Sequence, residues 1–495
     1  MRLATVIFQL CTAPLAQLPR DWNFPLVRSL SAAILCAAVF CIGQQAGEAD
    51  SPAATDGAVV KNQGFLPFAD APINYRSNNL NDPVAKLQRR LERGEIKLQY
   101  DSQHGYLKSV LDALHIPVSS QALVFSKTSF QFPDIAPDKP RALYYDDDVY
   151  VGQVHNGKFL EFVSFDPVQG AIFYVLDEHR DLHPKFERAE VDCIQCHVAG
   201  STRGVPGVLL RSVFTKPDGS PDAGAKSFIT GQESPLSQRW GGWYVTAKAG
   251  GQGAMANVTI SDPQHPEQLE RAAGANVADL GGRFDTAAYL TPSSDIVALM
   301  VLAHQTQMHD LITLTNYQTR LAAFADEKRN QAQGLASATL SDVARKQFEG
   351  PAEQLVRYLL FTNEAPLETS IEGTSDFAKQ FAARGPRDSE GRSLRDFDLH
   401  TRIFKYPCSY LIYSEAFDAI PEPAKEYIYR RLFDVLSSRE PSPEFASLSS
   451  QDRRAILEIL VATKPGLPDE WKQFVRNANQ GTTGRIPAGT ANLQP

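Results

Sequence analysis

The sequence predicts an α+β protein, in which an antiparallel β-rich domain over residues 81–282 is followed by a mostly α-helical domain over residues 283–480. Between residues 121 and 250, runs of β-branched and aromatic residues alternate with turn residues, which is typical of strands. After Gly282 the apolar residues recur at helical spacing. A chain of 495 residues also exceeds what one hydrophobic core usually organises, so we expect two or more folding units.

The N-terminal segment has the pattern of a targeting signal. An apolar run of roughly 13 residues follows Arg28, which is too short to span a bilayer comfortably but suits the core of a secretory signal. Gly47 and Ala49 then provide the small residues of a cleavage site. We therefore expect a signal peptide over residues 1–49 and a periplasmic or otherwise extracytoplasmic protein. The alternative is an uncleaved membrane anchor.

The β-rich domain is expected to begin with helices and to continue as a meander. Residues 50–80 lack any hydrophobic period and predict an extended lead-in. Asp82-Pro83 is a helix start that Gly94 ends, and a second short helix begins near Gly105. Turn residues such as Asn156-Gly157 then separate the expected antiparallel strands. These strands cover 122–128, 141–154, 158–166, 171–178, 209–219 and 239–251.

The second domain is expected to consist of helices with Pro, Gly, Ser or Asp at their ends. One long helix should begin near Ser294, because the sequence has a Ser-Asp start signal and then no Pro or Gly through Lys328. The last residues, 481–495, are polar and predict a flexible tail. Shorter amphipathic helices are predicted over 341–350, 351–363, 374–385, 421–438, 449–464 and 468–478.

Composition excludes two classes of protein. The 49 basic and 57 acidic residues do not cluster into the basic stripe that nucleic acids require, so no nucleic-acid partner is expected. Three of the six cysteines lie in the predicted signal peptide, which leaves Cys193, Cys196 and Cys408 in the mature chain. An exported chain of this size with three cysteines is not a disulfide scaffold.

The stretch VDCIQCHVAG contains the motif C-x-x-C-H, formed by Cys193, Cys196 and His197. Two thiols at this spacing reach the two vinyl groups of one haem, and the imidazole that follows supplies an axial ligand to the iron. Extracytoplasmic location is where such attachment takes place. We therefore predict one covalently bound haem c, with Cys193, Cys196 and His197 as its binding residues.

Other uses of the two cysteines remain open. A thioredoxin-like C-x-x-C would be expected at the start of a helix in a βαβ unit. A structural zinc site would want a second pair of ligands at similar spacing. Cys408, the other mature cysteine, stands alone, but His197, His179 and His183 could contribute. A plain disulfide in a loop is the third alternative.

The sixth iron ligand has three candidates. Met255 is the first choice, because it lies in the Gly-rich loop GGQGAMANV, which can bring a side chain over a ring without steric conflict. An isolated methionine of this kind also suits an irregular gap in a core. His304 and Met308 share one face of the long helix, and either could coordinate the iron as its sixth ligand instead. Polar side chains in an apolar helix more usually make buried hydrogen bonds to neighbouring helices.

Three further groups allow a functional and a structural interpretation. Trp240 and Trp243 could wall a haem or fill a core. The carboxylates of Asp146–Asp148 could bind calcium, but a turn between two strands explains them more simply. Three arginines near Cys408 could contact haem propionates, although ion pairing is the commoner role of such groups. They are Arg392, Arg395 and Arg402, beside Asp396 and Asp398.

Several stretches resemble an uncharacterised family of exported bacterial cytochrome-c-like proteins with a single C-x-x-C-H motif. They cover residues 122–131, 141–154, 191–214, 234–246, 289–313 and 395–421. The resemblance implies haem binding but no particular reaction. Members of this family read His-Met-Gly-Asn around the methionine, whereas Ala254 and Ala256 flank Met255 here. That departure removes a possible histidine ligand and favours Met255 as the ligand if this loop reaches the iron.

Two haem functions follow from these observations. The first is extracytoplasmic electron transfer to a redox partner protein of unknown identity, with six-coordinate iron. The second is a peroxidase-like oxidoreductase whose iron keeps an open distal position. A non-haem protein that uses the C-x-x-C as a disulfide or zinc site is the third possibility, and whether the protein is an enzyme is left open.

Overall fold

The computed structural model describes residues 66–335, 339–439 and 441–483. The predicted signal peptide, the first part of the lead-in and most of the C-terminal tail lie outside the described residues. All described residues belong to one compact unit. The boundary expected near Gly282 therefore falls inside that unit.

The fold is α+β, as predicted, and its largest element is an antiparallel sheet of seven strands. The sheet order is β6-β5-β4-β3-β2-β1-β9, so that consecutive strands of the meander are neighbours and β9 closes the far edge beside β1. A separate pair is formed by β7 and β8. The strands are β1 (Ala122–Val124), β2 (Arg141–Tyr145), β3 (Val149–Gln153), β4 (Phe159–Asp166), β5 (Gly170–Asp177), β6 (Phe186–Arg188), β7 (Arg211–Val213), β8 (Ser227–Ile229) and β9 (Trp243–Tyr244).

The sheet is covered on both faces. Alternate residues of β5 show this, because Ala171 and Phe173 belong to one large hydrophobic cluster while Ile172 and Tyr174 belong to another. The second cluster includes helices α3 (Pro83–Glu92) and α4 (Leu107–Ala113). Both helices confirm the sequence prediction. Double coverage also explains why the strands read as near-continuous apolar runs rather than as alternating ones.

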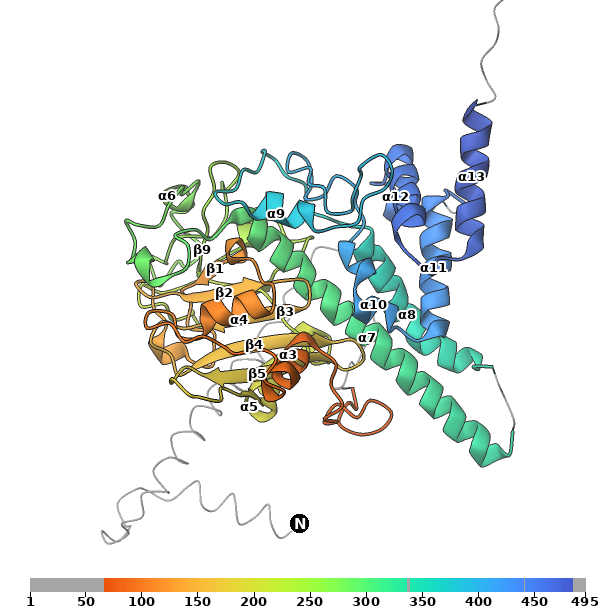
Figure 1. Cartoon of the computed structure of the whole chain (residues 1–495). Coiled ribbons are helices and arrows are strands. Elements are labelled where there is room, and N and C mark those ends of the chain that lie inside the picture. The colour runs from red at the N-terminus through yellow and green to blue at the C-terminus, as the bar shows by residue number, and fades with distance from the viewer. Residues whose placement is uncertain (1–65, 336–338, 440, 484–495) are drawn as a thin grey trace, which may run out of the picture. The chain divides into compact units, whose positions relative to one another are not determined.

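Helix α7 (Ile296–Gln333) connects the sheet with the C-terminal helices. It begins one residue after its N-cap Asp295, close to the predicted start near Ser294, and contacts β5 on one side and α8, α10 and α11 on the other (Figure 1). Residues of the sheet and of the later helices accordingly share the larger hydrophobic cluster. The other helices of this part are α8 (Asp342–Leu359), α9 (Phe377–Ala383), α10 (Glu415–Asp418), α11 (Glu422–Leu436), α12 (Ser450–Thr463) and α13 (Asp469–Thr483).

Helix α8 differs from the prediction of two separate helices over 341–350 and 351–363. It is continuous through Pro351. A proline inside a helix removes one backbone hydrogen bond and normally breaks or kinks it. Here α8 packs along both α7 and α11, and Ala352 and Leu355, directly after the proline, are fully buried. We conclude that tertiary packing outweighs the local signal.

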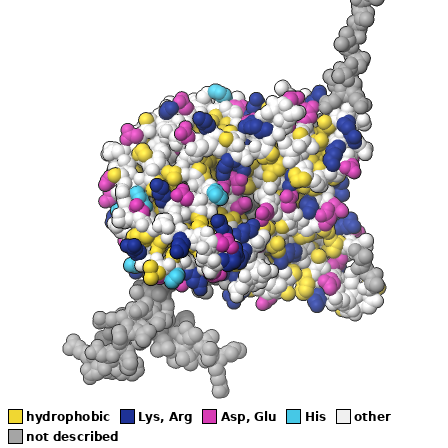
Figure 2. Space-filling view, in the orientation of Figure 1, with side chains coloured by type: hydrophobic (Ala, Val, Ile, Leu, Met, Phe, Trp, Pro, Cys, Tyr) yellow, Lys and Arg dark blue, Asp and Glu magenta, His cyan; other side chains and the backbone are white. Residues whose placement is uncertain are grey.

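Two observations concern the outside of the molecule. On the face shown in Figure 2, basic and acidic side chains are interspersed.

Within residues 66–335, 339–439 and 441–483, no helix has the combination of length and apolar character that crossing a bilayer requires.

Candidate functional site

The C-x-x-C-H motif lies on a short helix at the edge of the seven-stranded sheet. Helix α5 (Glu190–His197) follows the edge strand β6 directly, and His197 is its last residue. Cys193, Cys196 and His197 are three and four residues apart along this helix, so they share one side of it. Cys193 is half-buried against the larger hydrophobic cluster, whereas Cys196 is exposed. One thiol is thus anchored to the core and the other faces outward.

The side chain of His197 has a defined orientation. Its Nδ1 lies 2.9 Å from the carbonyl oxygen of Gly207, and its ring packs against Phe173 of β5 with 4.9 Å between centroids. A carbonyl can only accept a hydrogen bond, so Nδ1 carries the proton. Removal from water lowers the pKa of His197 and favours the neutral ring. A neutral ring protonated at Nδ1 presents the lone pair of Nε2, which is the form that ligates metals.

The loop after the motif holds Gly207 in place. The N–H of Gly207 donates to the backbone oxygen of His197 at 3.0 Å, so the two residues are joined twice. Thr202 braces the loop from inside, because its hydroxyl donates to the oxygen of Val205 at 2.9 Å and accepts from the N–H of Ala199 at 3.0 Å. The acceptor of the His197 proton therefore belongs to a folded turn.

Met255 lies in a different small cluster. It is buried with Phe214 and Ile260, and its sulfur accepts a hydrogen bond from the hydroxyl of Ser212 at 3.7 Å. Among the described residues, neither the hydrogen bonds of Met255 nor its hydrophobic cluster includes His197. The structure thus gives Met255 a packing role, and its role as sixth ligand stays a prediction.

The alternative ligand His304 uses both of its ring nitrogens within the core. Nδ1 lies 2.8 Å from Oε1 of Gln232, and Nε2 lies 2.8 Å from the hydroxyl of Ser409. The ring stacks on Phe361 with 4.5 Å between centroids, and burial lowers the pKa of His304 to about 3. Met308 is fully buried in the larger cluster. The expected hydrogen bonding between buried elements is therefore present at His304.

Trp240 and Trp243 belong to the core. Both are buried in the larger hydrophobic cluster, and Nε1 of Trp243 donates to the carbonyl oxygen of Arg211 at 2.8 Å. Cys408 is likewise fully buried, and burial raises the pKa of its thiol to about 12. The prediction that Cys408 acts as a small buried hydrophobic residue is confirmed.

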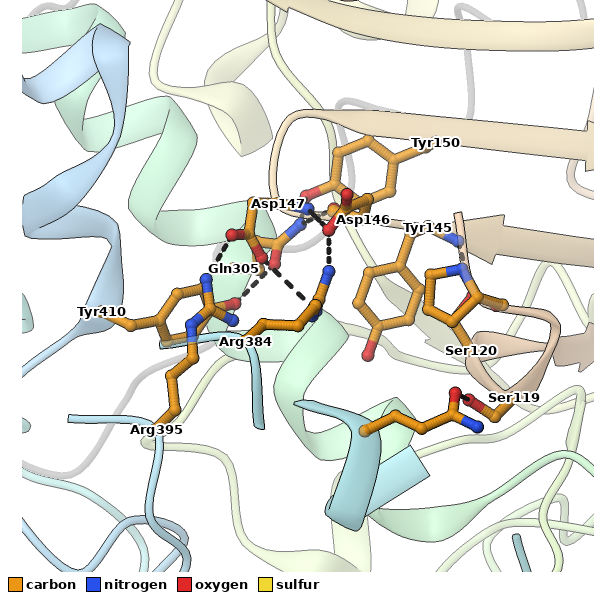
Figure 3. A network of polar contacts seen from close by, with 12 residues as sticks. Ser119, Ser120, Tyr145, Asp146, Asp147, Tyr150, Gln305, Arg384, Arg395 and Tyr410 are labelled. Atoms are coloured by element: carbon orange, nitrogen blue, oxygen red, sulfur yellow. Dashed lines mark hydrogen bonds and ion pairs between the residues drawn. The ribbon is translucent and has the colours of Figure 1, made fainter. Parts of the chain in front are cut away.

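The acidic run forms the turn between β2 and β3 and takes part in ion pairs. Arg384 pairs with both Asp146 and Asp147, and Arg395 pairs with Asp147, as Figure 3 shows. Beside them, Nε2 of Gln305 donates to the backbone oxygen of Asp146 at 2.7 Å. This arrangement agrees with the turn interpretation. The run thus links the sheet to the segment over residues 384–395.

The two remaining arginines are also paired with carboxylates. Arg392 contacts Asp388 at 2.7 Å and Glu458 at 3.0 Å, and Arg402 contacts Asp452 at 2.7 Å. Structural ion pairing, the commoner of the two expected roles, therefore accounts for them. Contact of these arginines with haem propionates is not needed to explain their positions.

Three residues of the site were not identified from the sequence: Phe173, Gly207 and Asp310. Asp310 lies on α7, is fully buried, and accepts a hydrogen bond from the N–H of Val208 at 3.0 Å. Asp310 ends the mostly polar run 304–310 and directly precedes Leu311 and Ile312. A carboxylate in a helix expected to be buried is a signal that could have identified it. The other two residues carry no signal of their own, because their roles depend on contacts across the fold.

The residues of the motif fit a covalent haem better than they fit zinc. An exposed thiol, a half-buried thiol and an imidazole whose Nδ1 is hydrogen-bonded to a backbone carbonyl are the groups that haem attachment uses. In the part of the chain that the structure describes, no three His, Cys, Asp or Glu side chains are grouped so that they could hold a metal ion together. All pairings of β6 are antiparallel, which differs from the βαβ setting of thioredoxin-like motifs.

Comparison of the chain with protein-family models, with curated proteins and with solved structures gave no match.

Proposed function

We propose that the protein binds one haem c covalently and takes part in electron transfer outside the cytoplasm. The observation that carries this proposal is the hydrogen bond between Nδ1 of His197 and the Gly207 carbonyl, because Nε2 would then be the nitrogen that coordinates iron. Haem iron would supply one-electron chemistry by alternating between its ferrous and ferric states.

The residues of α5 have separate roles in this proposal. The thiols of Cys193 and Cys196 would hold the haem through thioether bonds. His197 would supply a nitrogen ligand to the iron, and Phe173 restricts the rotation of its ring. Placement at the edge of the sheet next to an exposed Cys196 favours electron exchange with a partner protein, because part of the site faces solvent.

The proposal is tested on the full chain after export in a bacterium that attaches haem to such motifs. The pyridine haemochrome spectrum of the purified protein should show a c-type band with one haem per chain. A His197→Ala variant should retain the thioether bonds but lose the wild-type axial ligation. A colourless wild-type protein would exclude haem binding.

Binding of carbon monoxide to the reduced protein distinguishes the electron-transfer function from the peroxidase-like alternative. A six-coordinate electron carrier should bind carbon monoxide poorly in its reduced form, whereas an open distal position should bind it readily. Ready binding would contradict the carrier function and favour an oxidoreductase.

A further inference from the structure

The buried Asp310 lies against the peptide that His197 contacts. Its Oδ1 accepts a hydrogen bond from the N–H of Val208 at 3.0 Å. A side chain at position 207 would collide with the same carboxyl group, so this close approach requires the glycine found there. Helix α7 and the loop after the motif therefore meet at Asp310 and Gly207.

One amide group connects Asp310 with His197. The carbonyl of Gly207 and the N–H of Val208 belong to the same peptide unit, and the carbonyl accepts the proton of Nδ1 of His197 at 2.9 Å. A peptide that donates at one end and accepts at the other is polarised, and each hydrogen bond strengthens the other. Asp310 thereby fixes the direction of the carbonyl and increases its strength as an acceptor.

The position of Asp310 is costly for the fold. The side chain is completely buried, and burial raises the pKa of its carboxyl group well above the usual range. Within the described residues, Oδ2 makes no hydrogen bond. A buried polar atom without a partner destabilises a protein, and an apolar side chain would avoid that cost. The presence of aspartate at position 310 is therefore not explained by the stability of α7 alone.

We propose that Asp310 is a positioning residue for His197, which acts through the Gly207–Val208 peptide to keep the proton on Nδ1 and Nε2 available as the iron ligand. This inference rests on the proposed haem function, but the position of the proton on His197 can be measured separately from haem binding.

The test uses nitrogen NMR of the mature chain, prepared without haem and with ¹⁵N-labelled histidine. His197 is assigned by its loss in His197→Gln. In the wild type, the neutral imidazole should carry its proton on Nδ1. In Asp310→Ala, the ratio of the Nδ1-protonated to the Nε2-protonated form should fall about fivefold to tenfold, the effect of losing one net hydrogen bond.

Two variants act as controls. Asp310→Asn keeps an oxygen that accepts from Val208 and should retain the wild-type form of His197. Thr313→Val changes another buried polar residue of α7, which lies against Gly170 rather than against the loop, and should leave His197 unchanged. A proton on Nε2 in the wild type or in Asp310→Asn would overturn the proposal, even if Asp310→Ala does not fold. An unchanged ratio in a folded Asp310→Ala would also overturn it.

The reduction potential of the haem-loaded protein provides a second readout. A weaker hydrogen bond at Nδ1 makes His197 less basic and stabilises oxidised iron less. Asp310→Ala should therefore favour the reduced form about tenfold, or about 59 mV for one electron. Asp310→Asn should show a smaller shift, and an unchanged potential in Asp310→Ala would contradict the proposal. Absence of haem from the wild type would refute the proposed function alone, since the NMR result does not depend on haem.

Discussion

Replacing His304 with leucine should destabilise the protein at neutral pH and make its stability less sensitive to acid. The imidazole makes hydrogen bonds of 2.8 Å to both Gln232 and Ser409 and stacks on Phe361. Leucine has a comparable volume but no polar atom. The substitution therefore leaves two buried polar groups without their partner while it largely preserves the packing.

The size of both effects can be worked out from these contacts. Each buried group left unpaired costs about 1–3 kcal/mol, so the loss of a partner at both Gln232 and Ser409 should lower the free energy of unfolding at pH 7 by about 2–6 kcal/mol. Burial lowers the pKa of His304 to about 3, below the ordinary histidine value. The unfolded state then binds more protons between pH 6.5 and 3, and stability is lost as the pH falls through this range. From pH 7 to pH 5 the loss due to His304 is about 2 kcal/mol.

Urea unfolding of the wild type and His304→Leu at pH 7 and pH 5 measures these quantities. The variant should be less stable at pH 7, and it should lose about 2 kcal/mol less than the wild type on acidification. Equal losses in both proteins would refute the buried, neutral state of His304. A changed haem spectrum with unchanged stability would instead identify His304 as an iron ligand.

Three other substitutions test separate features of the structure. Asp295→Ala removes the N-cap of α7 and also the acceptor of the backbone N–H groups of residues 374 and 375. The free energy of unfolding measured in urea should therefore fall by about 3–5 kcal/mol. A loss below about 1 kcal/mol would contradict this role. Arg395→Met removes one ion pair of Asp147 and leaves only the longer pair with Arg384. The free energy of unfolding should fall by about 2–3 kcal/mol in the same assay. An unchanged urea midpoint would show that the pair with Arg395 does not stabilise the protein. Met255→Leu conserves volume and should change stability by less than about 1.5 kcal/mol. If the variant gains the ability to bind carbon monoxide, the predicted sixth ligand is confirmed, and an unchanged spectrum would contradict that role.

Local patterns in the sequence were sufficient for much of the fold. The long helix predicted to begin near Ser294 is α7, which is capped by Asp295. The predicted meander corresponds to β1–β5, and the acidic run is its turn between β2 and β3. These elements were predictable because their turns, caps and apolar periods lie within a few residues of one another.

Features that depend on distant contacts were not predictable. The continuation of α8 through Pro351 depends on packing against α7 and α11 rather than on local preference. Strand β6 has three residues, which is too short for a recognisable pattern, yet it defines the sheet edge from which α5 begins. Whether the β-rich and helical parts share one core is likewise decided by how α7 packs.

The candidate site shows the same division. The spacing of Cys193, Cys196 and His197 predicts haem attachment without any structure. The hydrogen bond from His197 to Gly207 depends on a turn of the following loop, and Asp310 reaches the same peptide from a helix about 100 residues further along the chain. Spacing therefore identified the groups that would bond to haem, but it could not identify the groups that orient them.

The mass of the exported, purified chain tests the central claim most directly. We predict a mature chain whose mass exceeds that of the polypeptide by one haem, and which loses the covalent haem in a Cys193→Ser, Cys196→Ser double variant. Cys408→Ser, a change to the buried cysteine outside the motif, should keep the haem. A wild-type mass equal to that of the polypeptide alone, with Cys193 and Cys196 both open to alkylation, would contradict the account.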